Sequence, residues 1–88
     1  MTFRIETEAR GRCTAFVLSG RIEKRAIAEL RRLFDGQKVY RDIVVLNLKD
    51  VYVIDRDVVS FFVSCEADGV KLENCAPYIR EWMEREKD

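Results

Sequence analysis

The 88-residue sequence contains no histidine, one proline and four glycines, and these scarcities argue against several classes of function. Without histidine, the common zinc sites and the usual catalytic base are hard to build, and the three cysteines form no C-x-x-C pair. The isolated glycines make neither a dinucleotide-binding fingerprint nor a phosphate-binding loop. We therefore expect a protein that uses no cofactor and no metal ion and is not an enzyme.

A net charge of one sign and a long apolar run are also missing. The 16 basic residues balance the 16 acidic ones, and the basic residues of the segment 21–32 alternate with acidic ones, which is typical of a solvated helix face. No apolar run approaches the roughly 18 residues that span a bilayer, and the polar start lacks the apolar core of a signal peptide. We expect a cytoplasmic protein that neither binds nucleic acid nor inserts into a membrane.

What is present is the composition of one globular domain, with 48% hydrophobic and 36% charged residues. We treat residues 1–88 as a single α/β domain, because the chain is too short for two. Cys13, Cys65 and Cys75 are interpreted as small buried apolar residues in a reducing compartment.

The beginning of the sequence predicts a hairpin. Phe3 and Ile5 alternate with charged residues, as in a strand with one buried face. After a turn at residues 9–11, residues 12–18 are nearly all apolar or β-favouring and predict a second strand, which Ser19-Gly20 stops. Apolar residues at helical spacing over 22–34 then predict an amphipathic helix that ends at Asp35-Gly36 and is followed by a loop over 37–41.

The central part of the sequence predicts a buried strand that leads into a helix. The continuous β-branched and apolar run over 43–48 is typical of a central strand. Lys49-Asp50 then begins a turn, and the apolar residues of 51–54 are expected to pack over the end of the sheet, with Tyr52 partly exposed. Asp55 is the predicted N-cap, its carboxylate accepting from the amide of Asp57 or Val58.

A wide apolar face predicts a heavily buried helix that ends at Gly69, followed by a short edge strand over 70–73 and a last helix beginning at Pro77. The element order is β-β-α-β-α-β-α, with a mixed four-stranded sheet, an N-terminal hairpin and two right-handed crossovers. If the sheet grows in one direction, the first two helices cover the same face. The last helix or a second copy of the chain would then cover the other.

Three carboxylates lie close together in the sequence at Asp50, Asp55 and Asp57. They are the kind of ligands that a magnesium ion prefers, which leaves a small carboxylate- or metal-dependent enzyme as an alternative function. Helix caps and turn residues are the interpretation that we favour.

The element order and two segments resemble the STAS family, the domain of anti-sigma factor antagonists. The segments are Leu18-Ser19-Gly20-Arg21-Ile22, where the second strand ends, and Val51-Tyr52-Val53-Ile54-Asp55-Arg56-Asp57, which enters a helix. The resemblance implies a non-enzymatic module for protein–protein interaction in bacterial-type signalling and regulation. It also implies that the start of the second helix binds an anti-sigma kinase-like ATPase, or that the chain is a subunit of a larger complex such as a lipid transporter.

Three positions depart from the family pattern, Arg56, Asp57 and Val58, and the first of them matters most. In the family this helix opens with Asp-Ser-[Ser/Thr]-Gly, and the first serine is phosphorylated to break the complex. Asp55 matches the aspartate, but Arg56 stands in place of that serine, so phosphorylation at this position is impossible. Arginine offers five donors for a partner carboxylate, although a solvated arginine without a role is an equal alternative.

These observations give our prediction of the site. We expect Arg21, Tyr52, Asp55, Arg56 and Asp57 to form the centre of a surface that binds a protein partner, either a kinase-like ATPase or a transporter or sensor subunit. Ser60 and Ser64 are the only speculative phosphorylation sites nearby, and we interpret them as solvated helix residues. A homodimer without a separate partner is a further alternative.

Overall fold

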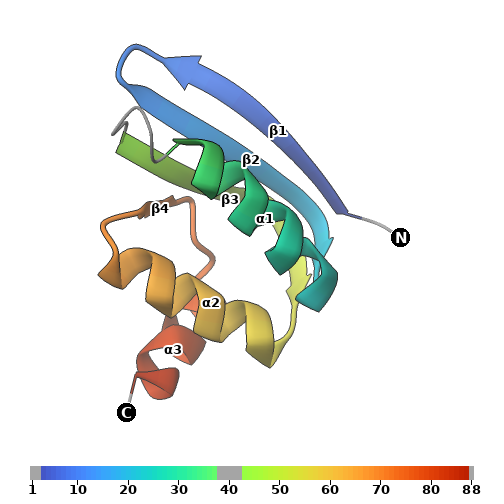
Figure 1. Ribbon diagram of the computed structural model, residues 1–88. Helices are drawn as coiled ribbons and strands as arrows, with labels where there is room; N and C mark the ends of the chain where they lie inside the picture. The colour runs from blue at the N-terminus through green and yellow to red at the C-terminus, as the bar shows by residue number, and fades with distance from the viewer. Residues whose placement is uncertain (1–2, 38–42, 88) are drawn as a thin grey trace.

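The computed structural model describes residues 3–37 and 43–87, and they form a four-stranded sheet with three helices (Figure 1). In chain order the elements are β1 (Phe3–Arg10), β2 (Cys13–Ile22), α1 (Lys24–Gln37), β3 (Ile43–Ile54), α2 (Arg56–Ala67), β4 (Lys71–Glu73) and α3 (Pro77–Glu86). The predicted order and the mixed sheet are confirmed. Among the described helices, none is long and apolar enough to cross a membrane.

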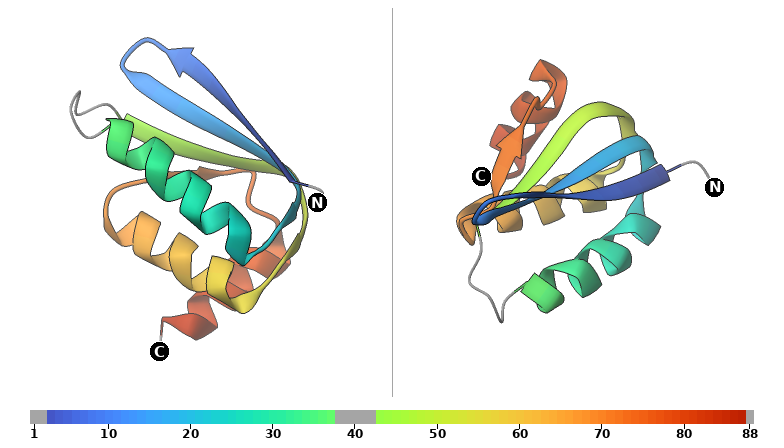
Figure 2. Two further views of the ribbon diagram at one scale, coloured as in Figure 1. Left: turned by 45° about the vertical axis from the view of Figure 1, so that its right-hand side comes forward. Right: turned by 90° about the horizontal axis from the view of Figure 1, so that it is seen from above.

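The sheet has the strand order β1-β2-β3-β4, with β1 antiparallel to β2 and the other two pairs parallel. It therefore grows in one direction along the chain. As expected from that growth, α1 and α2 lie on the same side of the sheet, and both crossovers are right-handed (Figures 1 and 2). Seen from above, α3 lies on the side away from α1, where it packs against α2 (Figure 2).

The hairpin strand β2 is longer than predicted, because Ser19-Gly20 does not end it. Gly20 adopts a positive φ of 90° within the strand, and the register with β3 shifts on both sides of Ser19-Gly20. Such an irregularity bends a strand, and a φ of 90° is strained for a residue with a Cβ, which accounts for glycine at this position. The strand thus continues to Ile22, which is fully buried and belongs to β2 rather than to the predicted helix.

Strand β3 is also longer than predicted, because the expected turn at Lys49-Asp50 is part of the strand. The register with β2 slips between Asn47 and Asp50 and again between Val51 and Val53, so β3 carries one extra residue at each place. The amide of Lys49 donates to the side-chain oxygen of Asn47 at 3.0 Å inside the first of these bulges. A bulge provides the change of direction that we attributed to a turn.

The apolar residues at the end of β3 are placed as predicted. Val51 and Ile54 are buried, whereas 65% of Tyr52 is exposed. Helix α1 begins at Lys24 and runs through Gly36 to Gln37, so the predicted stop at Asp35-Gly36 is wrong. Apart from Gln37, the predicted loop over 37–41 lies outside the described residues.

The core lies between the sheet, α1, α2 and α3. Its largest fully buried side chains come from every one of these elements: Phe16, Leu18, Ile22, Leu30, Leu46, Leu48, Val58, Val59, Phe62, Ile79 and Met83. The wide apolar face predicted for α2 is buried. The helix ends at Ala67, and the predicted glycine, Gly69, follows it with a φ of 97°. The amide of Val70 then donates to the carbonyl of Cys65 at 3.0 Å, the closing bond of a left-handed C-terminal cap.

The last helix, α3, lies on the side of the sheet away from α1, which is one of the two covers that we expected for this face. Ala15 and Val45 pair across β2 and β3 on this face, and their exposed fractions are 0% and 3%. Arg10 on β1 pairs with Glu8 on the same strand and, at 3.5 Å, with Glu73 on β4. The second ion pair joins β1 and β4, the two edge strands of the sheet, so we expect the Arg10 side chain to help to cover the small apolar residues between them. Ala15 and Val45 are thus buried within a single copy of the chain.

Candidate functional site

The junction between β3 and α2 is organised by one carboxylate. Asp55 has an extended backbone, and its Oδ1 accepts a hydrogen bond from the Val58 amide at 2.9 Å, which confirms it as the N-cap of α2. Its Oδ2 accepts a second bond from the Lys24 amide at 3.0 Å, at the first residue of α1. The first amides of a helix have no partner within the helix, so one side chain satisfies the starts of two helices. This second bond was not predicted.

The other predicted residues are on the surface around this junction. Tyr52, Arg56, Asp57 and Arg21 are all exposed. Arg21 is at the end of β2 and is the register partner of Val53, the residue after Tyr52. The carboxyl ends of the parallel strands β2 and β3 therefore bring Arg21 and Tyr52 to the same end of the sheet, as expected from the topology.

Two residues of α3 complete this surface, and the sequence analysis missed both. The hydroxyl of Tyr78 donates to the carbonyl of Tyr52 at 3.2 Å, and 48% of Tyr78 remains exposed. The Nε of Arg56 donates to Glu86 at 3.2 Å; the Arg56 side chain is 79% exposed and that of Glu86 20%. The helical spacing of Tyr78 with Ile79 and Trp82 suggested that Tyr78 belongs to the core. Its position at the border of the apolar face of this helix is the only signal in the sequence of a surface role.

The start of α2 faces two directions. Arg56 turns toward α3, where it pairs with Glu86, whereas Asp57 borders a hollow between α1 and α2 together with Lys24 and Ser60. Adjacent residues of a helix point about 100° apart, which accounts for this division. The five predicted residues are thus not one patch. Arg21 and Tyr52 lie at the carboxyl ends of β2 and β3, and Arg56 lies against α3. Asp57 lies on the side of α1.

The three carboxylates considered for magnesium do not form a metal site in the described part of the chain. No group of three or more acidic or thiol side chains suited to a metal ion occurs there. Both oxygens of Asp55 accept backbone amides, which is the capping role that we favoured. Ser60 and Ser64 are exposed on α2, as expected of solvated helix residues.

An ion-pair network holds α3 against α2 beside the candidate site. Arg80 donates to Glu66 at 2.9 Å, and the Nζ of Lys87 lies 3.7 Å from the same carboxylate. The hydrogen bond from Arg80 and the two nearby positive charges hold the pKa of Glu66 below its ordinary value. This network fixes the helix that supplies Tyr78 and Glu86.

The three cysteines are free thiols, of which Cys65 is buried and the other two are half-buried. Burial, with a smaller contribution from the charge of Asp68, raises the pKa of Cys65 to about 12. A thiol in this state is protonated at neutral pH and is a poor nucleophile or metal ligand. The expectation of small apolar cysteines therefore holds best for Cys65.

Comparisons with known proteins add no assignment: no protein-family model matches the chain, and no curated protein matches it.

Proposed function

We propose that this chain is a non-enzymatic interaction module that binds a partner protein through the start of α2, in the manner of an anti-sigma factor antagonist. The observation that supports the proposal best is the double cap at Asp55, which joins the first turns of two helices through the 2.9 Å and 3.0 Å hydrogen bonds. A binding surface on such a fixed junction loses little conformational entropy when a partner binds.

The composition of the surface also supports this function. Tyr52, Tyr78 and Arg56 are all exposed. The hydroxyl of Tyr78 donates to the carbonyl of Tyr52 near the start of α3, and Arg56 pairs with Glu86 at the end of the same helix. Tyrosine and arginine are the residue types most enriched among those that dominate the energy of protein interfaces. We place the centre of the interface on these three residues and Arg21, and we assign Asp55 a structural role beneath it.

The proposed complex differs from the family pattern in its regulation. Because Arg56 occupies the position of the phosphorylated serine, a kinase-like partner has no hydroxyl to modify there. Arg56 is instead held by Glu86, a carboxylate that is mostly buried. Binding through this surface is therefore constitutive with respect to that switch.

Affinity capture from the source organism with the tagged chain tests the proposal. We expect Tyr52→Ala and Arg56→Glu each to weaken binding of the captured partner by about 2 kcal/mol, roughly thirtyfold in Kd, as measured afterwards with the purified pair. Arg12→Glu is the matched control, because Arg12 is an exposed arginine at the hairpin, at the other end of β2 from Arg21. Unchanged binding by both site variants would refute the assigned surface.

The identity of the captured protein separates the alternatives within this class. An ATPase of the anti-sigma kinase type supports sigma-factor control, and a transporter or sensor subunit supports a role in a larger complex. With the kinase-type partner, we expect that ATP does not release the complex and that no phosphate is found on α2. Phosphorylation of Ser60 or Ser64 accompanied by release would contradict the constitutive complex.

A further inference from the structure

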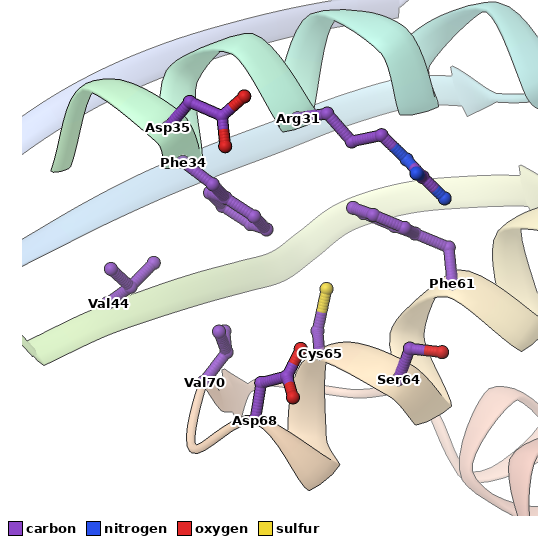
Figure 3. Close-up of a pocket in the computed structure, with 9 residues that line it drawn as sticks. All are labelled: Arg31, Phe34, Asp35, Val44, Phe61, Ser64, Cys65, Asp68 and Val70. Atoms are coloured by element: carbon purple, nitrogen blue, oxygen red, sulfur yellow. The ribbon is translucent and has the colours of Figure 1, made fainter. Parts of the chain in front are cut away.

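A groove runs between α1 and α2, and neither Tyr52 nor Tyr78 lines it. It consists of two hollows. The first, of about 430 Å³, lies beside Lys24, Ile27 and Asp57, and the second, of about 500 Å³, lies beside Phe34, Val44 and Cys65 (Figure 3). Arg31, Phe61 and Ser64 border both hollows, so the two form one depression along the pair of helices, which we call the seam groove.

In the middle of the seam groove, a cationic side chain lies over two stacked aromatic rings. The guanidinium of Arg31 lies over the ring of Phe61, 5.5 Å from its centre. The ring of Phe34 stacks on Phe61 with the centres 6.0 Å apart (Figure 3). In the described part of the chain, Arg31 has no carboxylate partner within ion-pair distance. Phe34 and Phe61 therefore form an apolar floor, and Arg31 offers one cation that a ligand carboxylate is able to reach.

The two walls differ in charge along most of the groove. Lys24 and Arg31 border it from α1, with Asp35 of the same helix at the far end of the second hollow, whereas Asp57 and Asp68 border it from α2. Ser60 and Ser64 lie between these two aspartates on the α2 wall. A ligand with one charge along its whole length would be repelled by one wall. A ligand whose acidic groups lie opposite Lys24 and Arg31, with none opposite Asp35, and whose basic groups lie opposite the α2 wall matches both walls.

The length of the groove selects an extended ligand. On the α1 wall, Ile27 borders the first hollow and Phe34 the second. They are seven residues apart, which is roughly 10 Å along a helix axis at 1.5 Å per residue. Residues i and i+7 of another helix are separated by the same distance and lie on the same face. An amphipathic helix is the element that places two apolar side chains at this spacing.

We propose that the seam groove binds an amphipathic helix of a partner protein. Two apolar residues of that helix, at i and i+7, occupy the two hollows, and an acidic residue between them pairs with Arg31. Basic residues on the opposite flank face Asp57 and Asp68. This inference goes beyond the proposed function, because it concerns a different surface and does not require a partner at the start of α2.

A designed peptide tests the proposal without knowledge of the natural partner. The probe is a helical peptide of about 15 residues with leucines at i and i+7, glutamates on one flank and lysines on the other. Its control is the same peptide with every charge reversed in sign. We expect the first orientation of charges to bind the full chain at least about tenfold more tightly than the reversed one, as measured by fluorescence anisotropy.

Paired variants locate the site. Ser64→Trp fills the middle of the groove from an exposed position, and we expect it to weaken peptide binding at least about tenfold. Ala67→Trp is its control on the exposed part of the same helix, and we expect a change of less than about twofold. Arg31→Glu should weaken binding at least about tenfold and improve binding of the reversed peptide, whereas Arg32→Glu, one residue along α1, should do neither.

Several outcomes overturn the proposal: no binding up to about 1 mM peptide, equal binding of both peptides, or binding that Ser64→Trp leaves unchanged. Self-association of the free chain that Ser64→Trp abolishes would assign the groove to a second copy and also overturn it. Tyr52→Ala and Arg56→Glu serve to separate the two surfaces. If they abolish capture of the natural partner but leave peptide binding intact, the seam groove is an independent site; if they abolish peptide binding, the peptide is not in the groove.

Discussion

The carboxylate of Asp55 accepts a hydrogen bond at 3.0 Å from the backbone amide of Lys24, 31 residues earlier in the chain. Lys24 begins α1 and Asp55 precedes α2, so this bond joins the exits of two neighbouring parallel strands. The same carboxylate caps α2 through Val58. The relative position of the two helix starts therefore depends on one side chain, and so do both surfaces proposed above.

Replacing Asp55 tests this double role. Asp55→Ala removes the acceptor for both amides, and at about 1 kcal/mol per lost cap we expect a loss of roughly 2 kcal/mol in the free energy of unfolding. Asp55→Asn keeps one oxygen as an acceptor but presents an amide group to the other donor. We expect about half or more of the loss in this variant. Urea unfolding followed by circular dichroism measures both.

Asp57→Asn is the control for charge at the same helix start, because Asp57 is exposed in the first turn of α2. Removing its charge should change the free energy of unfolding by less than about 1 kcal/mol. If Asp55→Asn unfolds at the same urea concentration as the original protein, the contact with Lys24 contributes nothing measurable.

The stability of the α2–α3 contact should depend on pH through Glu66. Its pKa is lowered in the folded state by the hydrogen bond from Arg80, so the pair stabilises the fold above the ordinary carboxylate pKa of 4.5. This contribution is lost as the pH falls through the lower folded-state pKa. We expect Glu66→Gln to lose about 0.5 to 1 kcal/mol at pH 7 and to approach the original protein below about pH 4.

Urea titrations at pH 7, 5, 4 and 3 measure this difference, each with Glu81→Gln as a control for loss of one carboxylate from the same region. Glu81 is exposed on α3. A gap between the original protein and Glu66→Gln that stays constant from pH 7 to pH 3 would show that ionisation of Glu66 does not contribute.

Arg10 should protect the open face of the sheet. We expect Arg10→Ala to uncover Ala15 and Val45, and therefore to increase binding of a hydrophobic dye and concentration-dependent self-association. Sedimentation velocity and dye fluorescence measure the two effects. Arg4→Ala is the matched control, since Arg4 is on the same strand and its 3.8 Å contact with Glu6 stays within that strand. Identical behaviour of the two variants would mean that other side chains cover the face.

Cys65 should be the slowest cysteine to react with a thiol reagent. With a pKa of about 12, its thiolate fraction at pH 8 is about 10⁻⁴, against roughly 0.2 for an ordinary cysteine, a difference of about a thousandfold. Alkylation with iodoacetamide followed by peptide mass spectrometry should find Cys13 and Cys75 modified first. In urea the three rates should converge, and a Cys65 that reacts as fast as Cys13 in the folded protein would contradict the buried, protonated thiol.

Much of the fold could be predicted because it depends on residues that are close together in the sequence. The run of β-branched residues in β3, the apolar stripe of α2 and the cap at Asp55 each depend on neighbours within a few residues of the chain. Two of the errors lie where a longer-range pairing overrides local signals. Ser19-Gly20 and Lys49-Asp50 look like stops, but the hydrogen bonds between β2 and β3 carry both strands past them as bulges.

The candidate site divides in the same way. The sequence by itself determined that Arg56 replaces a phosphorylatable serine, that Asp55 caps a helix, and that no glycine-rich phosphate loop is present, because these are properties of residue identity and spacing. Only the tertiary structure decided that Tyr78 and Glu86 flank Tyr52 and Arg56, that Asp57 turns to the seam groove, and that Arg10 reaches across the sheet to Glu73. These contacts join residues 26 to 63 positions apart, or depend on which side of a helix faces its neighbour, and packing of whole elements, rather than any local preference, selects them.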